Sequence, residues 1–194
     1  RLRAAIQASR EANMPKENIT RTINKSEIDV NKNYENLRYE GFGPYNVALI
    51  IETLTDNKNR TASNIRTILQ KNGGRLGETG STAHYFFSCG VIHVAKDKIA
   101  DEKIFDLSID INAKDCFSNL EYHEILTERE DFYKIKNEIE KNIDSFLYSG
   151  IEWRPQAYLN ISKEESDAVI KMLEILEEDE DVQNTFVNCN IHIN

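Results

Sequence analysis

Long apolar runs are missing from this 194-residue sequence. The longest, residues 47–51, is far shorter than the roughly 20 residues that a membrane-spanning helix needs, so we expect no membrane association. Cysteine is also scarce: Cys89, Cys116 and Cys189 are widely spaced and form no CxxC pair. This spacing favours reduced thiols in a cytoplasmic protein over a disulfide framework. The sequence starts at Arg1 without a methionine, and we therefore expect it to be a fragment.

Recognisable catalytic and metal-binding motifs are missing as well. The glycine-rich residues 73–80 follow a predicted helix instead of a strand, which indicates a cap and turn rather than a phosphate loop. His123-Glu124 begins a zinc-peptidase pattern that has no second histidine. The acidic residues 177–181 lack the spacing of a calcium loop. We expect no catalytic residues, no metal and no cofactor, and hence no enzyme.

Charge is distributed unevenly along the chain. The formal net charge is −9, but the first 75 residues hold more basic than acidic side chains, and the rest of the chain is strongly acidic. A local basic patch governs phosphate binding more than the total charge does. The asymmetry therefore indicates either one end that faces a polyanion or two ordinary domains that differ in charge.

Apolar periodicity predicts an α+β protein. Residues 1–26 are predicted to be helical, as an incomplete helical domain, with a break at Asn13-Met14-Pro15. Strand 46–55, helix 60–72 and a hairpin over 83–95 are followed, much later, by helix 164–178 and strand 182–189. This order is βαββαβ, which is that of a ferredoxin-like unit.

A split domain follows from this order. We predict a central ferredoxin-like domain from residues 34–96 and 160–194, with a second α/β unit, residues 97–159, inserted into it. Strand 182–189 should then pair with strand 46–55 or with the hairpin. The alternative is two consecutive units that meet near residue 97.

Residues 38–81 carry the most specific pattern. YEGFGP at residues 39–44 is a turn, VALIIETLTDNKNRT at 47–61 is a strand and loop, and KNGGRLGETGS at 71–81 is a glycine-rich segment. These blocks resemble the central signature of the YebC/PmpR family, and the first 23 residues and residues 161–188 resemble its helical start and closing elements. The sequence departs from the family pattern at Tyr45-Asn46, where a glycine pair is usual, at Arg75, where Asn is usual, and at Thr82.

The resemblance implies three domains, no catalytic centre, and a role as a DNA-binding transcriptional regulator or as a translation factor associated with mRNA or the ribosome. The expected partner is DNA, mRNA or rRNA, bound mainly through phosphates, which position a protein without specifying sequence. The expected contacts are Arg3, Arg10, Lys16 and Arg21 in the helical segment, and Lys58, Arg60, Arg66 and Lys71 in the central domain. The other hypothesis is a ferredoxin-like module that binds a protein or senses a small molecule.

Overall fold

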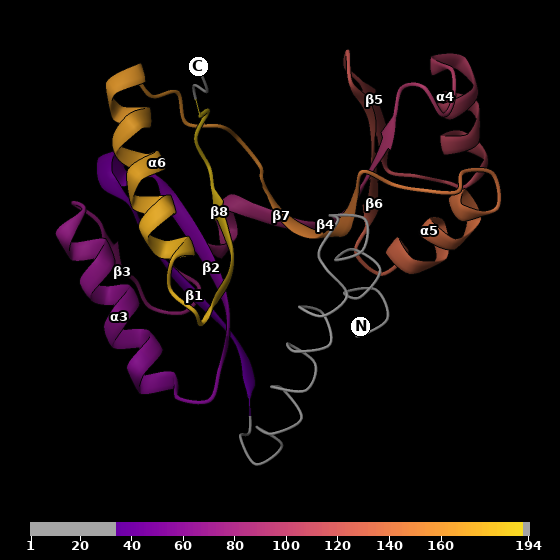
Figure 1. The fold of residues 1–194 in the computed structure, drawn as a ribbon. Coiled ribbons are helices and arrows are strands. Elements are labelled where there is room, and N and C mark those ends of the chain that lie inside the picture. Colours follow the sequence, from indigo (N-terminus) through magenta and orange to yellow (C-terminus); the bar gives the residue numbers. More distant parts are fainter. Residues whose placement is uncertain (1–33, 192–194) are drawn as a thin grey trace, which may run out of the picture.

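The computed structural model describes residues 34–191. They form an α+β protein with two four-stranded antiparallel sheets, each covered by two helices on one face (Figure 1). The expected helical segment, residues 1–26, lies outside the described residues.

The first sheet has the order β3-β1-β2-β8. β1 (Glu35–Phe42) runs through the 3-10 turn η1 (Pro44–Asn46) into β2 (Ala48–Thr55). Helix α3 (Lys58–Lys71) then leads to the short strand β3 (Arg75–Leu76), while helix α6 (Lys163–Glu177) and strand β8 (Val182–Val187) come from the far end of the chain. β8 pairs antiparallel with β2, which confirms the predicted long-range pairing.

The second sheet has the order β5-β6-β4-β7. It follows the chain through a 3-10 turn, η2 (Ala83–Tyr85), β4 (Phe86–Ala95), α4 (Asp101–Asp110), β5 (Asp115–Ser118), β6 (Tyr122–Glu128), α5 (Phe132–Glu140) and β7 (Tyr148–Pro155). From β4 onward this is βαββαβ with the ferredoxin-like strand order. The first sheet has the same spatial arrangement, but its chain order is ββαβ and then, after the second unit, αβ.

The predicted hairpin over residues 83–95 is wrong. Residues 86–95 form one continuous strand of the second sheet, paired with β6 and β7. Gly90 does not turn the chain but makes room for α5, since an added Cβ would lie 2.3 Å from the Phe132 ring. Between β7 and α6 the chain forms a single β-bridge, between Leu159 and Cys189. The division into domains stays a prediction, and these pairings support moving its first boundary from residue 96 to before β4.

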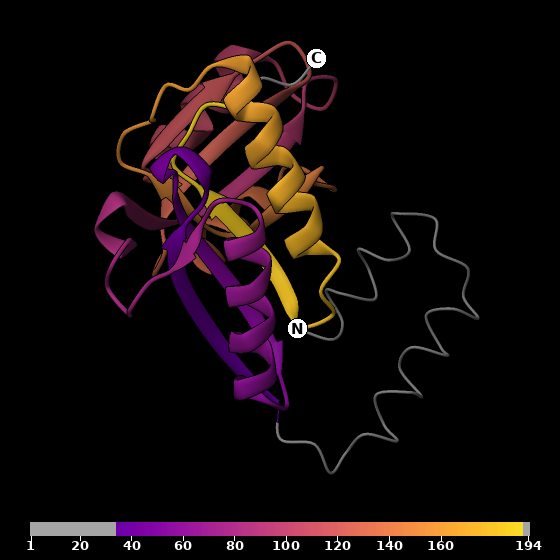
Figure 2. The same cartoon turned by 90° about the vertical axis from the view of Figure 1, so that its left-hand side faces the viewer.

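Helices α3 and α6 lie side by side across one face of the first sheet (Figure 2). In α3, Thr61, Ile65 and Leu69 are buried at a spacing of four residues, which puts them on one face of the helix. The helix begins at a cap in which the Asn57 side chain accepts a hydrogen bond from the backbone N–H of Arg60 at 3.1 Å. The core of this unit consists of Leu49, Ile51, Ile65, Leu69, Met172 and Leu176.

Helix α6 begins at a capping box. The Ser162 hydroxyl accepts from the backbone N–H of Glu165, and the Glu165 carboxylate accepts from the backbone N–H of Ser162 at 2.7 Å. The box fixes the register in which Val169, Met172 and Leu176 face the sheet.

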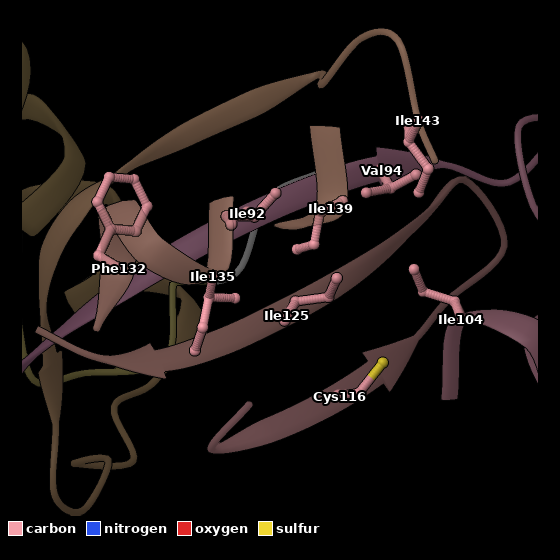
Figure 3. Close-up of a cluster of buried hydrophobic side chains, with 9 residues drawn as sticks. All are labelled: Ile92, Val94, Ile104, Cys116, Ile125, Phe132, Ile135, Ile139 and Ile143. Atoms are coloured by element: carbon pink, nitrogen blue, oxygen red, sulfur yellow. The ribbon is translucent and has the colours of Figure 1, made fainter. Parts of the chain in front are cut away.

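The second unit has its own core between its sheet and helices α4 and α5 (Figure 3). Its side chains are Ile92, Val94, Ile104, Cys116, Ile125, Phe132, Ile135, Ile139 and Ile143. A smaller cluster around Ile50, Phe86 and Trp153 connects the two units. It packs the face of the first sheet that no helix covers against the start of β4 and the end of β7. The Trp153 indole also donates to the Glu52 carboxylate at 2.9 Å across this contact.

Candidate nucleic-acid interface

Helix α3 and the strand after it form the most basic continuous segment of the described chain. Residues 57–77 contain no acidic residue. The basic residues of this segment are Lys58, Arg60, Arg66, Lys71 and Arg75, and all five are exposed. Thr61, Ile65 and Leu69 are buried against the sheet, while the cations of α3 remain exposed.

Three of the four expected cations of α3 are available to an anion. In the part of the chain that the structure describes, no carboxylate forms an ion pair with Lys58, Arg66 or Lys71. Lys58 is the first residue of the helix, which begins two residues before the predicted start, and its backbone carbonyl accepts a hydrogen bond from Tyr39 at 3.1 Å. These three side chains can therefore reach a phosphate without first breaking an ion pair.

Arg60 lies in a different environment. Its guanidinium Nη2 donates to Asp181 at 2.9 Å and to Asp56 at 2.9 Å, and its Nε donates to Asp181 at 3.3 Å. The hydrogen bonds to Asp181 and then Asp56 raise the pKa of Arg60. The Thr61 hydroxyl also donates to Asp181, at 2.7 Å. Arg60 and Thr61 thus tie the turn between α6 and β8 to the start of α3.

These carboxylates change the electrostatics of the α3 N-terminus. A helix N-terminus attracts anions through its free N–H groups and its dipole. Here Asp56 and Asp181 already supply negative charge, and Asp179 accepts a hydrogen bond from Asn64 in the next turn of α3. Arg66, Lys71 and Arg75 lie farther along the chain, in the C-terminal half of α3 and in β3, and among the described residues no carboxylate forms an ion pair with them.

A buried carboxylate fixes the glycine-rich loop after β3. Glu40 on β1 is 2% exposed and accepts hydrogen bonds from the backbone N–H groups of Thr82 and Ala83, each at 2.8 Å. Arg38 lies 3.3 Å from its other oxygen. Burial alone would raise the pKa of Glu40, but hydrogen bonds from the backbone of Thr82, Gly80 and Ala83 outweigh burial and hold this pKa below its ordinary value.

The structure brings together only part of the predicted set. Arg3, Arg10, Lys16 and Arg21 lie outside the described residues. Lys58, Arg60, Arg66 and Lys71 all lie on α3, over nearly four turns of helix.

Arg75 is the cation that the expected set left out. It is exposed, its guanidinium lies 4.3 Å from the Phe42 ring centroid, and it donates to the Asn46 side chain at 3.2 Å. The signal that could have found it is the acid-free stretch, which continues past the end of the helix to Gly77.

The described residues offer little else that resembles a reactive site. The three cysteines are buried free thiols, and burial raises the pKa of each. Between residues 34 and 191, no group of three or more His, Cys, Asp or Glu side chains is arranged to hold a metal ion. None of the helices in that range is long and apolar enough to cross a membrane.

Comparison with known protein families shows to which family the chain belongs. A family model described as "TACO1/YebC second and third domain" matches residues 34–189. The chain belongs to the YebC/PmpR family. This membership confirms the resemblance of the three sequence blocks, and the matched range covers both sheets described above.

YebC-family relatives match over nearly the whole chain. A probable transcriptional regulatory protein of Pelagibacter ubique (strain HTCC1062) is 50% identical over 194 residues, which is 100% of this chain and 80% of that protein. A probable transcriptional regulatory protein of Zymomonas mobilis subsp. mobilis is 44% identical over 191 residues, 98% of this chain and 77% of that protein.

A solved structure has the same fold. The crystal structure of a conserved hypothetical protein from Aquifex aeolicus superimposes with a TM-score of 0.83 at 35% sequence identity. The match covers 99% of this chain and 80% of that one.

Proposed function

We propose that this protein regulates gene expression by binding nucleic acid through its phosphates. The observation that carries the proposal is the acid-free segment of residues 57–77, in which α3 and β3 carry exposed cations. The description of two relatives as probable transcriptional regulatory proteins supports a regulatory role. The protein is non-enzymatic and cytoplasmic in this proposal, and it acts on DNA as a transcriptional regulator or on mRNA or the ribosome as a translation factor.

The mechanism is electrostatic. Each cation that contacts a phosphate releases counterions condensed on the nucleic acid, and this release drives binding without reading the sequence. Lys58, Arg66 and Lys71 contribute most in this scheme because their charges are not shared with a carboxylate. Arg60 can contact a phosphate only while it keeps its hydrogen bonds to Asp56 and Asp181.

Charge reversal tests the proposal. Lys58→Glu, Arg66→Glu and Lys71→Glu, combined in one variant of the whole chain, should weaken binding to labelled RNA and DNA by at least 10-fold, on the order of 1.4 kcal/mol. The melting temperature should change little, since exposed charges contribute little to stability.

Lys103→Glu is the matched control, because Lys103 is exposed on α4 in the second unit. It should leave affinity close to that of the unmodified chain. Equal loss of binding in the control and in the triple variant would show a general charge effect and refute an interface on α3.

A further inference from the structure

The turn between β1 and β2 has an uncommon backbone. Tyr45 has φ 59° and ψ 23°, and Asn46 also has φ 59°. A residue with a side chain seldom adopts this left-handed conformation, and a large ring adopts it at greater cost than glycine does. Backbone hydrogen bonds hold the turn in place, from Gly43 to the carbonyl of Val47 at 2.8 Å and from Val47 to the carbonyl of Pro44 at 3.2 Å.

The Tyr45 ring has neither a stacking partner nor a hydrogen bond among the described residues. Tyr45 is 51% exposed. Other exposed tyrosines pack on neighbouring rings, as Tyr85 does on His84 at 4.1 Å and Tyr148 on His93 at 5.4 Å. Within residues 34–191, Tyr45 has no such ring partner and its hydroxyl has no hydrogen bond. The turn therefore leaves about half of the Tyr45 surface exposed, with no other ring stacked on it.

The turn lies against the basic end of α3. Asn46 accepts a hydrogen bond from Arg75 at 3.2 Å. Gly73, which stands midway between Lys71 and Arg75 in the sequence, lies beside Pro44, since an added Cβ would be 3.8 Å from the Pro44 side chain.

Close backbone contact fixes the chain after α3 against the end of β1. A Cβ on Gly74 would lie 2.4 Å from the carbonyl oxygen of Phe42, so the chain after α3 rests directly on the end of β1. The turn that carries the exposed Tyr45 ring thus contacts Arg75 through Asn46, and it contacts Gly73, two residues after Lys71, through Pro44. Stacking rings interleaved with phosphate-binding cations are the features with which proteins bind unpaired nucleic-acid strands.

We propose that Tyr45 stacks on an unpaired nucleobase while Lys71 and Arg75 contact the phosphates beside it, so that this interface selects single-stranded over double-stranded nucleic acid. The inference rests on the proposed function and names its ligand more closely. Bases in a duplex are already stacked on each other, and only a single strand offers a free face to the ring. The ligand chemistry, a free base flanked by phosphates, is common to RNA and DNA.

The test removes the Tyr45 ring and at the same time relieves the unfavourable left-handed backbone conformation. Tyr45→Gly removes the stacking surface, but glycine adopts the left-handed conformation freely. Affinity for a labelled single-stranded RNA should fall by roughly 5-fold to 150-fold, the range that stacking of one base contributes. The melting temperature should stay unchanged or rise by up to about 4 °C. Tyr45→Phe keeps a stacking ring and should keep the affinity.

Three ligands and one control complete the experiment. Single-stranded DNA of the same sequence separates RNA from DNA as the preferred source of the base, and the duplex made from it should bind Tyr45→Gly and the unmodified chain equally. Tyr133→Ala removes another exposed tyrosine, on α5 in the second unit, and should leave affinity unchanged.

Each contrary result has a distinct meaning. If Tyr45→Gly binds the single strand as tightly as the unmodified chain does, or loses affinity for the duplex by the same factor, the stacking inference is wrong. If its melting temperature falls, the ring has a structural role and the inference is also wrong. The proposed function survives these outcomes, because it depends on the charge-reversal test on α3.

Discussion

Glu40 offers a sharp test of how the glycine-rich loop is held. Its carboxylate is buried and satisfies two backbone N–H groups, those of Thr82 and Ala83. Glu40→Ala would leave both groups unpaired; the buried Thr82 donor should cost about 1–3 kcal/mol, and the part-buried Ala83 donor should add less. Glu40→Gln keeps an acceptor oxygen but loses the charge, so it should cost about 1–2 kcal/mol at neutral pH.

The effect should depend on pH in a defined direction. The pKa of Glu40 in the folded chain is held below the ordinary value of 4.5. The stability that this depressed pKa contributes is therefore fully present above pH 4.5 and is lost as the pH falls through the folded-state value. Glu40→Gln has no such group, so the gap between it and the unmodified chain should shrink on acidification.

Urea unfolding followed by fluorescence measures this gap, because Trp153 is the single tryptophan and is partly buried where the two units meet. The free energy of unfolding would be compared at pH 7 and at about pH 4. An equal difference between Glu40→Gln and the unmodified chain at both pH values would refute the role assigned to the ionised carboxylate.

Two further perturbations test the first unit. Asp181→Ala removes the acceptor shared by Arg60 and the buried Thr61 hydroxyl, so the free energy of unfolding measured in urea should fall by about 2–3 kcal/mol; no fall would show that this contact does not hold the α6–β8 turn. Removing residues 162–194 deletes α6 and β8 and uncovers Leu49 and Ile51, so the shortened chain should be found in the insoluble fraction; a soluble chain that unfolds cooperatively would contradict the shared sheet.

Local signals account for the parts of the fold that the sequence predicted. Helix α6 is marked by its Ser162–Glu165 capping box and by apolar residues at helical spacing, and both signals lie within the helix itself. The return of β8 to β2 followed from counting elements, since the first sheet needed another helix and strand to complete it.

The prediction of a hairpin over residues 83–95 was wrong because a tertiary contact, and not the local sequence, determines the course of β4. Cys89-Gly90 has the composition of a turn, yet Gly90 sits in mid-strand where Phe132 of α5 requires the space of a missing side chain. Phe132 is more than forty residues away in the sequence, and local propensity cannot register such a neighbour.

The candidate interface was also only partly predictable from the sequence. The basic residues of α3 could be read from composition, and the structure places them on an exposed helix. The pairing of Arg60 with Asp181 could not, because the two residues are 121 positions apart. Tyr45 likewise stood out in the sequence only as a departure from the family pattern, and its left-handed backbone and proximity to Arg75 come from the structure.

The salt dependence of binding tests the central claim most directly. The affinity of the whole chain for a single-stranded RNA would be measured across a salt series and compared with that of the variant combining Lys58→Ala, Arg66→Ala and Lys71→Ala. If these side chains bind phosphates, affinity should fall steeply with salt, and the slope of log K against log salt should become shallower by about 0.7 for each phosphate that the variant no longer neutralises, or about 2 in all. An affinity that is independent of salt, or a slope that is identical in the two proteins, would contradict phosphate binding by α3.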